Sequence, residues 1–209
     1  MNFYTRNEVI KIYGEDYCSI EGGLQEKKYV FWDHCRCNEI LSQQKKIVIA
    51  ECGLGLALNL TEAYENWSPD SSIEFISIEK NPVYVDELFF GNKAFLKAYR
   101  EIKSGWNHFY IEPTFIVHVF IGDVMEAFES FPKPVDCWFL DGFSPKNNEE
   151  MWSEELCRKV AKYTKPKGRL STFSCAGLVK RNLKSSGFEI SKVTGYGKKR
   201  EMLIALKRE

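Results

Sequence analysis

The chain has 209 residues, of which 44% are hydrophobic and 14% aromatic, enough for one globular domain and too many for long disorder. Its 29 basic and 29 acidic residues cancel, and no apolar run approaches the ~18 residues that a membrane-spanning helix needs. The first residues lack the apolar core of a secretory signal, and the seven cysteines lack zinc-site spacing. We expect a cytoplasmic protein with reduced thiols, no membrane association and no metal site.

The first part of the chain, residues 1–45, shows no regular alternation of elements. Two short strands and one helix are expected there: Val9–Tyr13, Tyr17–Ile20 and about Asn38–Gln44. We interpret these residues as a short N-terminal extension that packs on the main domain, residues 46–209, so that the whole chain forms a single domain.

The main domain alternates β-branched apolar runs with stretches of helical spacing. Five runs are expected to be strands: Ile47–Cys52, Ile73–Ile78, Phe115–Ile121, Val135–Leu140 and Arg169–Ser174. Helices are expected over Ala57–Trp67, from Pro82, and around Met151 and Trp152. Strands that alternate with helices form parallel βαβ units, so the pattern predicts a doubly wound α/β sheet.

The end of the chain follows a different pattern. Only a short turn, Thr194–Lys199, separates the last two expected strands, Phe188–Val193 and Glu201–Leu206. A parallel crossover needs a longer connection, so these strands are predicted to form an antiparallel hairpin.

A glycine turn, Glu51–Ala57, follows the first strand of the main domain. Gly53 and Gly55 allow a tight turn and let a ligand approach the backbone closely. Glu79 ends the second strand, where a carboxylate can accept hydrogen bonds from both hydroxyls of a ribose. Asp123 ends the third strand, in position to meet an adenine amino group. Together these residues predict a nucleotide-type cofactor pocket.

The charge of the turn helps to choose the cofactor. Glu51 precedes Gly53 by two residues, and its charge disfavours a pyrophosphate and favours a ligand that carries an ammonium group. This turn, the ribose carboxylate and the terminal hairpin resemble class I S-adenosylmethionine-dependent methyltransferases, which have a Rossmann-like fold. On the pocket alone, an NAD enzyme is the main alternative.

Asp141 stands where the apolar strand Val135–Leu140 ends, before a Gly-Phe-Ser-Pro turn. Open α/β folds place their chemistry at such strand ends. The stretch Asp136–Trp152 closely resembles the signature of the MnmC-type tRNA methyltransferases, which complete the 5-methylaminomethyl group of 5-methylaminomethyl-2-thiouridine at the wobble position. Five further segments are similar to this family: Gly23–Phe31, Glu51–Asn59, Phe75–Lys80, Thr172–Arg181 and Gly195–Leu203.

Two departures from the family pattern stand out. Ala57 replaces a glycine, a change that we expect to be mild because alanine fits a helix start. Residues 32–38 leave the pattern.

Many family members also carry a flavin-dependent oxidase domain, for which 209 residues leave no room. The resemblance therefore implies the methyltransferase half alone, which methylates a 5-aminomethyl nucleoside that other enzymes have made.

The resemblance also implies a cofactor and its binding residues. With S-adenosyl-L-methionine bound, Gly53 and Gly55 would approach the methionine part, Glu79 would hold the ribose, and Asp123 would face the adenine. The full set of cofactor-binding candidates is Glu51, Gly53, Gly55, Asn59, Glu79, Asp123 and Asp141.

Methylation of a primary amine requires a neutral nitrogen whose lone pair is aligned with the bond to the transferred methyl group. Asp141 is the candidate that orients this amine, with relay of its proton as a second role. A carboxyl group of ordinary pKa, about 3.9, is a weak base towards an ammonium, so orientation is the favoured role. Phe143 is the candidate that stacks on the substrate base or shields the methyl group. The alternatives are capping of the next turn for Asp141 and core packing for Phe143.

The charges are unevenly distributed. Up to residue 157 there are 14 Lys or Arg against 26 Asp or Glu, and after it 15 against 3. A basic segment favours a polyanionic partner, here tRNA, although the charges could also spread over a folded surface. The tRNA-binding candidates are Lys180, Arg181, Lys184, Lys198, Lys199 and Arg200.

Two other functions fit the sequence. One is a different methyltransferase or an aminopropyltransferase of the same fold that acts on a small amine. Such a substrate would favour an acidic pocket and would not explain the basic C-terminal part. The other is a catalytically silent module that binds S-adenosylmethionine or tRNA, against which the complete Asp141 turn argues.

Overall fold

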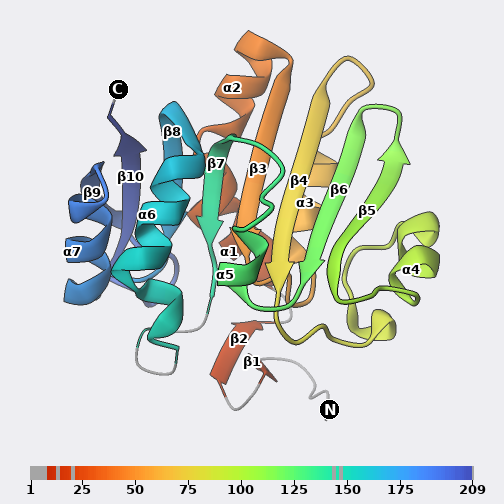
Figure 1. The fold of residues 1–209 in the computed structure, drawn as a ribbon, viewed down its shortest axis with the longest axis horizontal. Helices are drawn as coiled ribbons and strands as arrows, with labels where there is room; N and C mark the ends of the chain where they lie inside the picture. Colours follow the sequence, from red (N-terminus) through yellow and green to blue (C-terminus); the bar gives the residue numbers. More distant parts are fainter. Residues whose placement is uncertain (1–8, 13–14, 20–21, 143–144, 146–147, 209) are drawn as a thin grey trace.

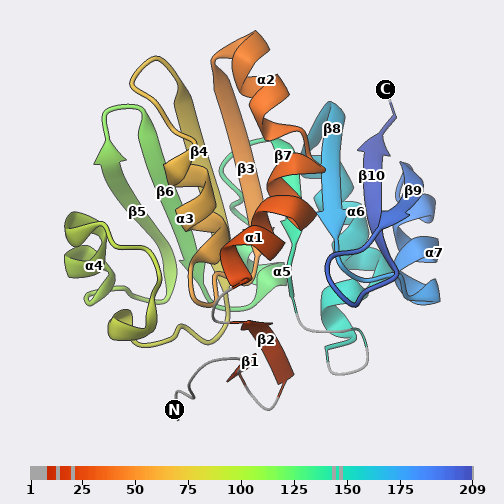
Figure 2. The same ribbon diagram turned by 180° about the vertical axis from the view of Figure 1, so that it is seen from behind.

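A twisted, eight-stranded sheet forms the centre of the protein in the computed structural model, which describes residues 9–12, 15–19, 22–142, 145 and 148–208 (Figures 1 and 2). The strand order is β5-β6-β4-β3-β7-β8-β10-β9. The strands are β3 (Lys46–Cys52), β4 (Ser72–Glu79), β5 (Gly105–Glu112), β6 (Phe115–Ile121), β7 (Val135–Leu140), β8 (Thr164–Thr172), β9 (Phe188–Thr194) and β10 (Glu201–Lys207).

The middle of the sheet is parallel and both of its edges are antiparallel. β3 pairs in parallel with β4 and β7, and these continue in parallel to β6 and β8. β5 runs antiparallel to β6, and β10 runs antiparallel to both β8 and β9. The predicted, mostly parallel α/β sheet with a C-terminal antiparallel hairpin is therefore confirmed.

Helices cover both faces of the sheet. Figure 2 shows α1 (Gly23–Lys27), α2 (Cys37–Gln44) and α3 (Leu58–Glu65) on one face, and Figure 1 shows α5 (Val124–Ala127), α6 (Glu154–Tyr163) and α7 (Gly177–Ser185) on the other. The remaining helical segments are the π-helical η1 (Lys28–Asp33), the 3-10 turns η2 (Val85–Glu87) and η3 (Glu150–Trp152), and α4 (Lys93–Tyr99).

The central strand β3 explains why two cores form. Its side chains alternate in direction, as in any strand, so Ile47 and Ile49 belong to the core under α3, whereas Val48 and Ala50 belong to the core under α6. Strands buried on both faces read as continuous apolar runs, which is why these strands were predictable from sequence.

The N-terminal extension packs into the core under α3. Val30, Phe31 and Trp32 of η1 are fully buried there. Ser171 of β8 donates a hydrogen bond to the carbonyl oxygen of Val30 at 2.5 Å. These contacts support the proposal that the extension, 1–45, belongs to a single domain with the sheet.

Two described strands precede α1 in the chain. β1 (Val9–Ile12) and β2 (Glu15–Ser19) pair antiparallel in a separate small sheet; two short strands were expected here, but the second begins at Glu15, two residues earlier than expected. The expected strand ends at Tyr13 and Ile20 lie outside the described residues. Within the described part of the chain, no helix combines the length and the apolar character that a membrane span requires.

Two expectations about the middle of the chain were wrong. No helix opens at Pro82; α4 begins only at Lys93, where the Asn92 side chain accepts hydrogen bonds from two backbone N–H groups of its first turn. Strand β5 was missed, because a half-exposed edge strand with many polar residues lacks the continuous apolar run of a central strand.

Candidate active site

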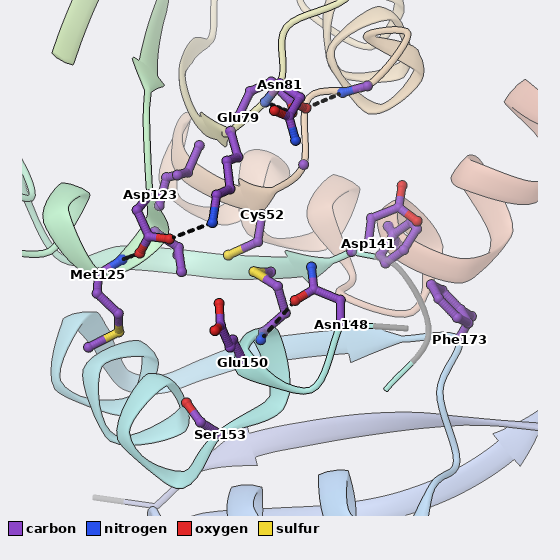
Figure 3. A pocket seen from close by; sticks show the side chains of 18 of the residues that line it. Cys52, Glu79, Asn81, Asp123, Met125, Asp141, Asn148, Glu150, Ser153 and Phe173 are labelled. Carbon is purple, nitrogen blue, oxygen red and sulfur yellow. Dashed lines mark hydrogen bonds and ion pairs between the residues drawn. The ribbon is translucent and has the colours of Figure 1, made fainter. Parts of the chain in front are cut away.

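A cavity of about 740 Å³ opens at the carboxyl ends of the parallel strands, a volume typical of small-molecule sites (Figure 3). Gly53, Glu79, Asp123 and Asp141 follow or end β3, β4, β6 and β7, and all four line it. In Figure 3, Asp123 lies on one side of the cavity and Asp141 on the opposite side, with Glu79 between them at the upper edge. The sheet topology thus brings the predicted strand-end residues together.

Gly53 lies between the ends of β4 and β7 and lines the cavity, close to Ile78 on one side and Asp141 on the other. Its backbone has a φ of +97°, a conformation that side chains rarely adopt, and its N–H donates to the carbonyl oxygen of Ile78 at 2.8 Å. A Cβ atom built on Gly53 would lie 3.8 Å from the carbonyl oxygen of Asp141. The ends of β3 and β7 are therefore in contact at this glycine.

Ala57 corrects one expectation. It caps α3 with φ 61° and ψ 30°, in the left-handed region, and is fully buried. A residue with a Cβ atom pays about 1–2 kcal/mol in this conformation, so alanine is not a neutral replacement for glycine here. Ala57 was expected to belong to the regular helix start, whereas it is the strained residue just before α3.

Glu79 holds the glycine turn in place. One carboxylate oxygen accepts a hydrogen bond from the Gly55 N–H at 2.9 Å, and the other accepts one from the Asn81 N–H at 2.8 Å. Burial raises the pKa of Glu79, and these N–H groups act in the opposite direction. The carboxylate therefore lines the cavity in a fixed orientation.

Asp123 both caps a helix and lines the cavity. Its side chain accepts the Met125 N–H at 2.9 Å at the start of α5 and pairs with Lys80, whose Nζ lies 3.1 Å from Oδ2. The N–H of Met125 and the charge of Lys80 lower the pKa of Asp123. The capping role does not remove it from the cavity, so the expected adenine contact stays a prediction.

The side chain of Asp141 is buried, with 4% of its surface exposed, and is held by two other side chains. Its Oδ2 accepts hydrogen bonds from Lys27 Nζ at 2.5 Å and from Asn59 Nδ2 at 2.9 Å. Burial raises the pKa of the Asp141 carboxyl group, whereas Lys27 and Asn59 act to lower it. Asp141 is therefore an oriented group rather than a simple turn cap.

Lys27 was not among the predicted site residues. It ends α1, is 5% exposed and lines the cavity. Val30 and Phe31 follow it by three and four residues, and both are buried. This spacing places Lys27 on the buried side of the helical segment, which is the signal that could have identified it.

Glu51 and Asn59 lie behind the cavity wall instead of in it. Glu51 is fully buried and accepts hydrogen bonds from Asn59 Nδ2 at 3.0 Å and from the Ser77 hydroxyl at 2.8 Å. Burial raises the pKa of Glu51 well above its usual range. A contact of Glu51 or Asn59 with the cofactor stays a prediction. In this structure Asn59 hydrogen-bonds to both Glu51 and Asp141 and so links the two carboxyl groups. Phe143 lies outside the described residues.

The predicted basic residues divide into two groups. Lys199, in the turn between β9 and β10, lines the cavity, where its Nζ lies 3.2 Å from Glu26 Oε1 and 4.4 Å from the Phe173 ring centre. Lys198 and Arg200 are exposed beside it. The other group lies on α7 and does not line the cavity: Lys180, Arg181 and Lys184. Among the described residues, no cluster of His, Cys, Asp or Glu suits a metal ion.

Comparison with known proteins identifies the family of this chain. Residues 87–208 match the S-adenosyl-L-methionine-dependent methyltransferase family. The chain is 35% identical over 208 residues to the tRNA 5-methylaminomethyl-2-thiouridine biosynthesis bifunctional protein MnmC of Methylobacillus flagellatus, and the match covers 91% of this chain and 32% of that protein. The MnmC protein of Campylobacter hominis is 31% identical over 200 residues, with 90% and 29% covered.

A solved structure gives the same result. The crystal structure of MnmC2 from Aquifex aeolicus superposes with a TM-score of 0.77 at 25% identity, over 94% of this chain and 65% of that one. The chain spans about a third of the length of the curated relatives that it matches. The resemblance to MnmC-type methyltransferases is confirmed for this portion of those proteins. More than half of the chain, residues 87–208, matches this family, so the chain belongs to the S-adenosyl-L-methionine-dependent methyltransferase family.

Proposed function

We propose that this protein transfers a methyl group from S-adenosyl-L-methionine to the amine of 5-aminomethyl-2-thiouridine at the tRNA wobble position, giving 5-methylaminomethyl-2-thiouridine. The observation that carries the proposal is the oriented, buried Asp141 carboxylate, which lines the same cavity as Glu79 and Asp123. Nine-tenths of the chain is similar to proteins named for the biosynthesis of this nucleoside, which points to the substrate.

The cavity fits S-adenosylmethionine. Backbone N–H groups, among them those of Gly55 and Asn81, hold the Glu79 carboxylate in the cavity lining, where it can accept hydrogen bonds from the two ribose hydroxyls. Asp123 offers its carboxylate on the same side, and the Cβ-free Gly53 lets the methionine part approach the backbone. When bound, the cofactor supplies a methyl group on a positively charged sulfonium, which suits a cavity whose described lining includes six acidic residues against three lysines.

Asp141 orients the acceptor amine. Its Oδ2 is already engaged by Lys27 and Asn59, and no donor among the described residues contacts Oδ1. Oδ1 is therefore the oxygen that accepts a hydrogen bond from the substrate amine. Because two donors fix the carboxylate, the nitrogen is held in one direction, which is the main requirement of a displacement reaction.

The basic turn between β9 and β10 offers the tRNA contact closest to this chemistry. Lys199 lies at the cavity, and Lys198 and Arg200 are exposed next to it, in position to contact backbone phosphates near the modified base. We assign Lys180, Arg181 and Lys184 on α7 to a second contact with the tRNA. We also propose a cytoplasmic location, where tRNA is modified and where buried free cysteines such as Cys52 and Cys137 stay reduced.

The proposal is tested with the purified protein, S-adenosylmethionine and tRNA that carries 5-aminomethyl-2-thiouridine. Nucleoside mass spectrometry should show the gain of one methyl group on that base, and no gain on tRNA that lacks the aminomethyl group. Cofactor binding without methylation of the modified tRNA would refute the proposal. Methylation or aminopropylation of free polyamine precursors instead would favour the small-amine alternative.

The tRNA interface is tested by replacing Lys198 and Arg200 with serine. The logarithm of tRNA affinity should then fall less steeply with the logarithm of salt concentration, by roughly 0.9 for each phosphate that the variant no longer neutralises. Affinity for S-adenosylmethionine should stay the same, because neither residue lines the cavity. An unchanged salt dependence would remove this turn from the tRNA interface.

A further inference from the structure

We infer that Lys27 is a positioning residue that acts through Asp141 to keep the substrate amine uncharged, an inference that rests on the proposed function. Without Lys27, the Asp141 carboxylate would hold the amine as an ammonium, which has no lone pair and cannot accept a methyl group. With Lys27, the same carboxylate accepts a hydrogen bond from the amine without adding net negative charge.

The position of Lys27 allows it to act on the Asp141 carboxylate inside the cavity. It lies at the end of α1, is 5% exposed, and reaches the cavity and the Asp141 carboxylate together. Its Nζ lies 2.5 Å from Asp141 Oδ2 and 5.6 Å from the centre of the Phe31 ring. Burial of a lysine is costly even when it is paired, and such pairs are weak evidence for stability alone.

The distance between two charges sets how strongly each changes the pKa of the other. At about 4 Å and an effective dielectric constant of about 20, one unit charge moves the pKa of another group by on the order of 2–3 units. A lone Asp141 carboxylate would raise the pKa of a bound amine by such an amount. Lys27 pairs with that carboxylate directly and acts in the opposite direction, so the two effects largely cancel at the amine nitrogen.

The other charged groups around the pair have partners of their own. Glu26 of α1 pairs with Lys199 of the β9–β10 turn at 3.2 Å. Lys28 of η1 pairs with Glu62 of α3 at 3.3 Å. Glu51 of β3 lies beneath Asn59, and burial favours its neutral form. Lys27 is therefore the cation that acts most directly on Asp141.

The test compares wild type with Lys27→Met and Lys27→Gln in single-turnover methylation of an anticodon stem-loop RNA that carries 5-aminomethyluridine. We expect the acid limb of the rate profile to move to higher pH by on the order of 1–2 units in both variants. The rate at neutral pH should then fall about tenfold or more, and it should recover at alkaline pH.

Lys28→Met is the matched control, because it removes the same charge from the next residue, whose side chain is 44% exposed and pairs with Glu62. Its profile should match that of wild type. A uniform loss of rate at every pH in the Lys27 variants would mean a purely structural role and would overturn the inference. Weaker cofactor binding with an unshifted profile would instead make Lys27 a ligand of the cofactor and would also overturn it.

A binding measurement gives a readout that does not depend on turnover. In the presence of S-adenosylhomocysteine, calorimetry in buffers of different ionisation enthalpy counts the protons released when the stem-loop binds. Wild type should release about one proton below the pKa of the free amine, and the Lys27 variants should release clearly less. RNA without the aminomethyl group should release none in either case. Equal release by wild type and variants would refute the inference.

The two proposals fail in different ways. If wild type does not methylate the stem-loop, the proposed function fails. If wild type methylates it and the Lys27 variants keep the wild-type pH profile and proton release, only the role of Lys27 fails. Thermal melting identifies a variant that does not fold, and Lys27→Gln, which keeps a polar side chain, guards against that outcome for Lys27→Met.

Discussion

The two halves of the cavity hold their carboxylates in different ways. In the cofactor half, Glu79 and Asp123 accept hydrogen bonds from backbone N–H groups, including those of Asn81 and Met125, two residues further along the chain. In the acceptor half, Asp141 is held by side chains that are distant in sequence, and Lys27 lies 114 positions before Asp141. Backbone donors are available to any sequence that forms these loops, whereas side-chain donors belong to this chain. We infer that the cofactor half is common to the fold and the acceptor half determines the substrate.

Asp141→Asn gives the largest effect that follows from this comparison. It keeps the shape of the side chain but removes the charge that orients the amine, and turnover should fall by about 10²- to 10⁴-fold. Affinity for S-adenosylmethionine should change only slightly, because the cofactor half is untouched. Rapid-quench kinetics and titration calorimetry separate the two quantities. An equal loss of turnover and of cofactor affinity would mean that the cofactor half and the acceptor half of the cavity do not work independently.

Glu79→Ala should produce the reverse pattern. Loss of a charged acceptor for the ribose and for the glycine turn should weaken cofactor binding by about 10- to 100-fold, since hydrogen bonds to charged groups contribute about 1.5–3 kcal/mol. Turnover at saturating cofactor should stay close to that of wild type. Glu65→Ala, which removes an exposed acid on α3, is the control and should bind the cofactor normally. Normal affinity of the Glu79 variant for S-adenosylmethionine would contradict a role of Glu79 in binding the ribose.

Glu51→Gln tests the buried network that links the two halves. Burial raises the pKa of Glu51 in the folded state, so its contribution to stability is present below its unfolded pKa and is lost as pH rises towards the folded value. Glutamine is neutral at every pH and can still hydrogen-bond Ser77 and Asn59. The melting temperature of the variant should therefore exceed that of wild type by a few degrees at mildly alkaline pH, and the gain should shrink in acid, as measured by calorimetry. A gain that grows in acid would contradict this assignment.

Ala57→Gly should have the smallest effect, confined to the cofactor half. Glycine relieves the left-handed strain at φ 61°, at the cost of a more flexible unfolded chain. The net gain should be about 1 kcal/mol or less, a rise of roughly 2–4 °C in melting temperature for a protein of this size. Turnover should be unchanged. A lower melting temperature would mean that the Ala57 methyl group packs well enough to outweigh the strain.

The same comparison explains what could be predicted from sequence. Strand β7 was predicted with its observed bounds, Val135–Leu140, because a strand buried on both faces is mostly apolar and only Asp136 interrupts this one. Glu79, Asp123 and Asp141 were recognised because each stands at the end of a parallel strand, and such ends meet at one edge of a sheet.

Other features were beyond reach of the sequence. The pairing of Lys27 with Asp141 depends on where α1 packs, which local propensity does not determine. Strand β5 forms because β6 offers it an edge, and its own polar residues give little sign of it. The left-handed conformation of Ala57 comes from the sharp turn after Gly53, which the sequence marks only by its glycines. In each case tertiary context decided the structure.

The long separation of Lys27 from Asp141 also sets an order of events during synthesis. At ribosomal rates of roughly 5–20 residues per second, Lys27 leaves the peptidyl-transferase centre roughly 6–23 s before its partner is made. During that interval the carboxylate of Asp141 does not yet exist, so Lys27 cannot form its ion pair. The ion pair that orients the acceptor side of the cavity can therefore form only after every strand that precedes β7 in the chain has been synthesised.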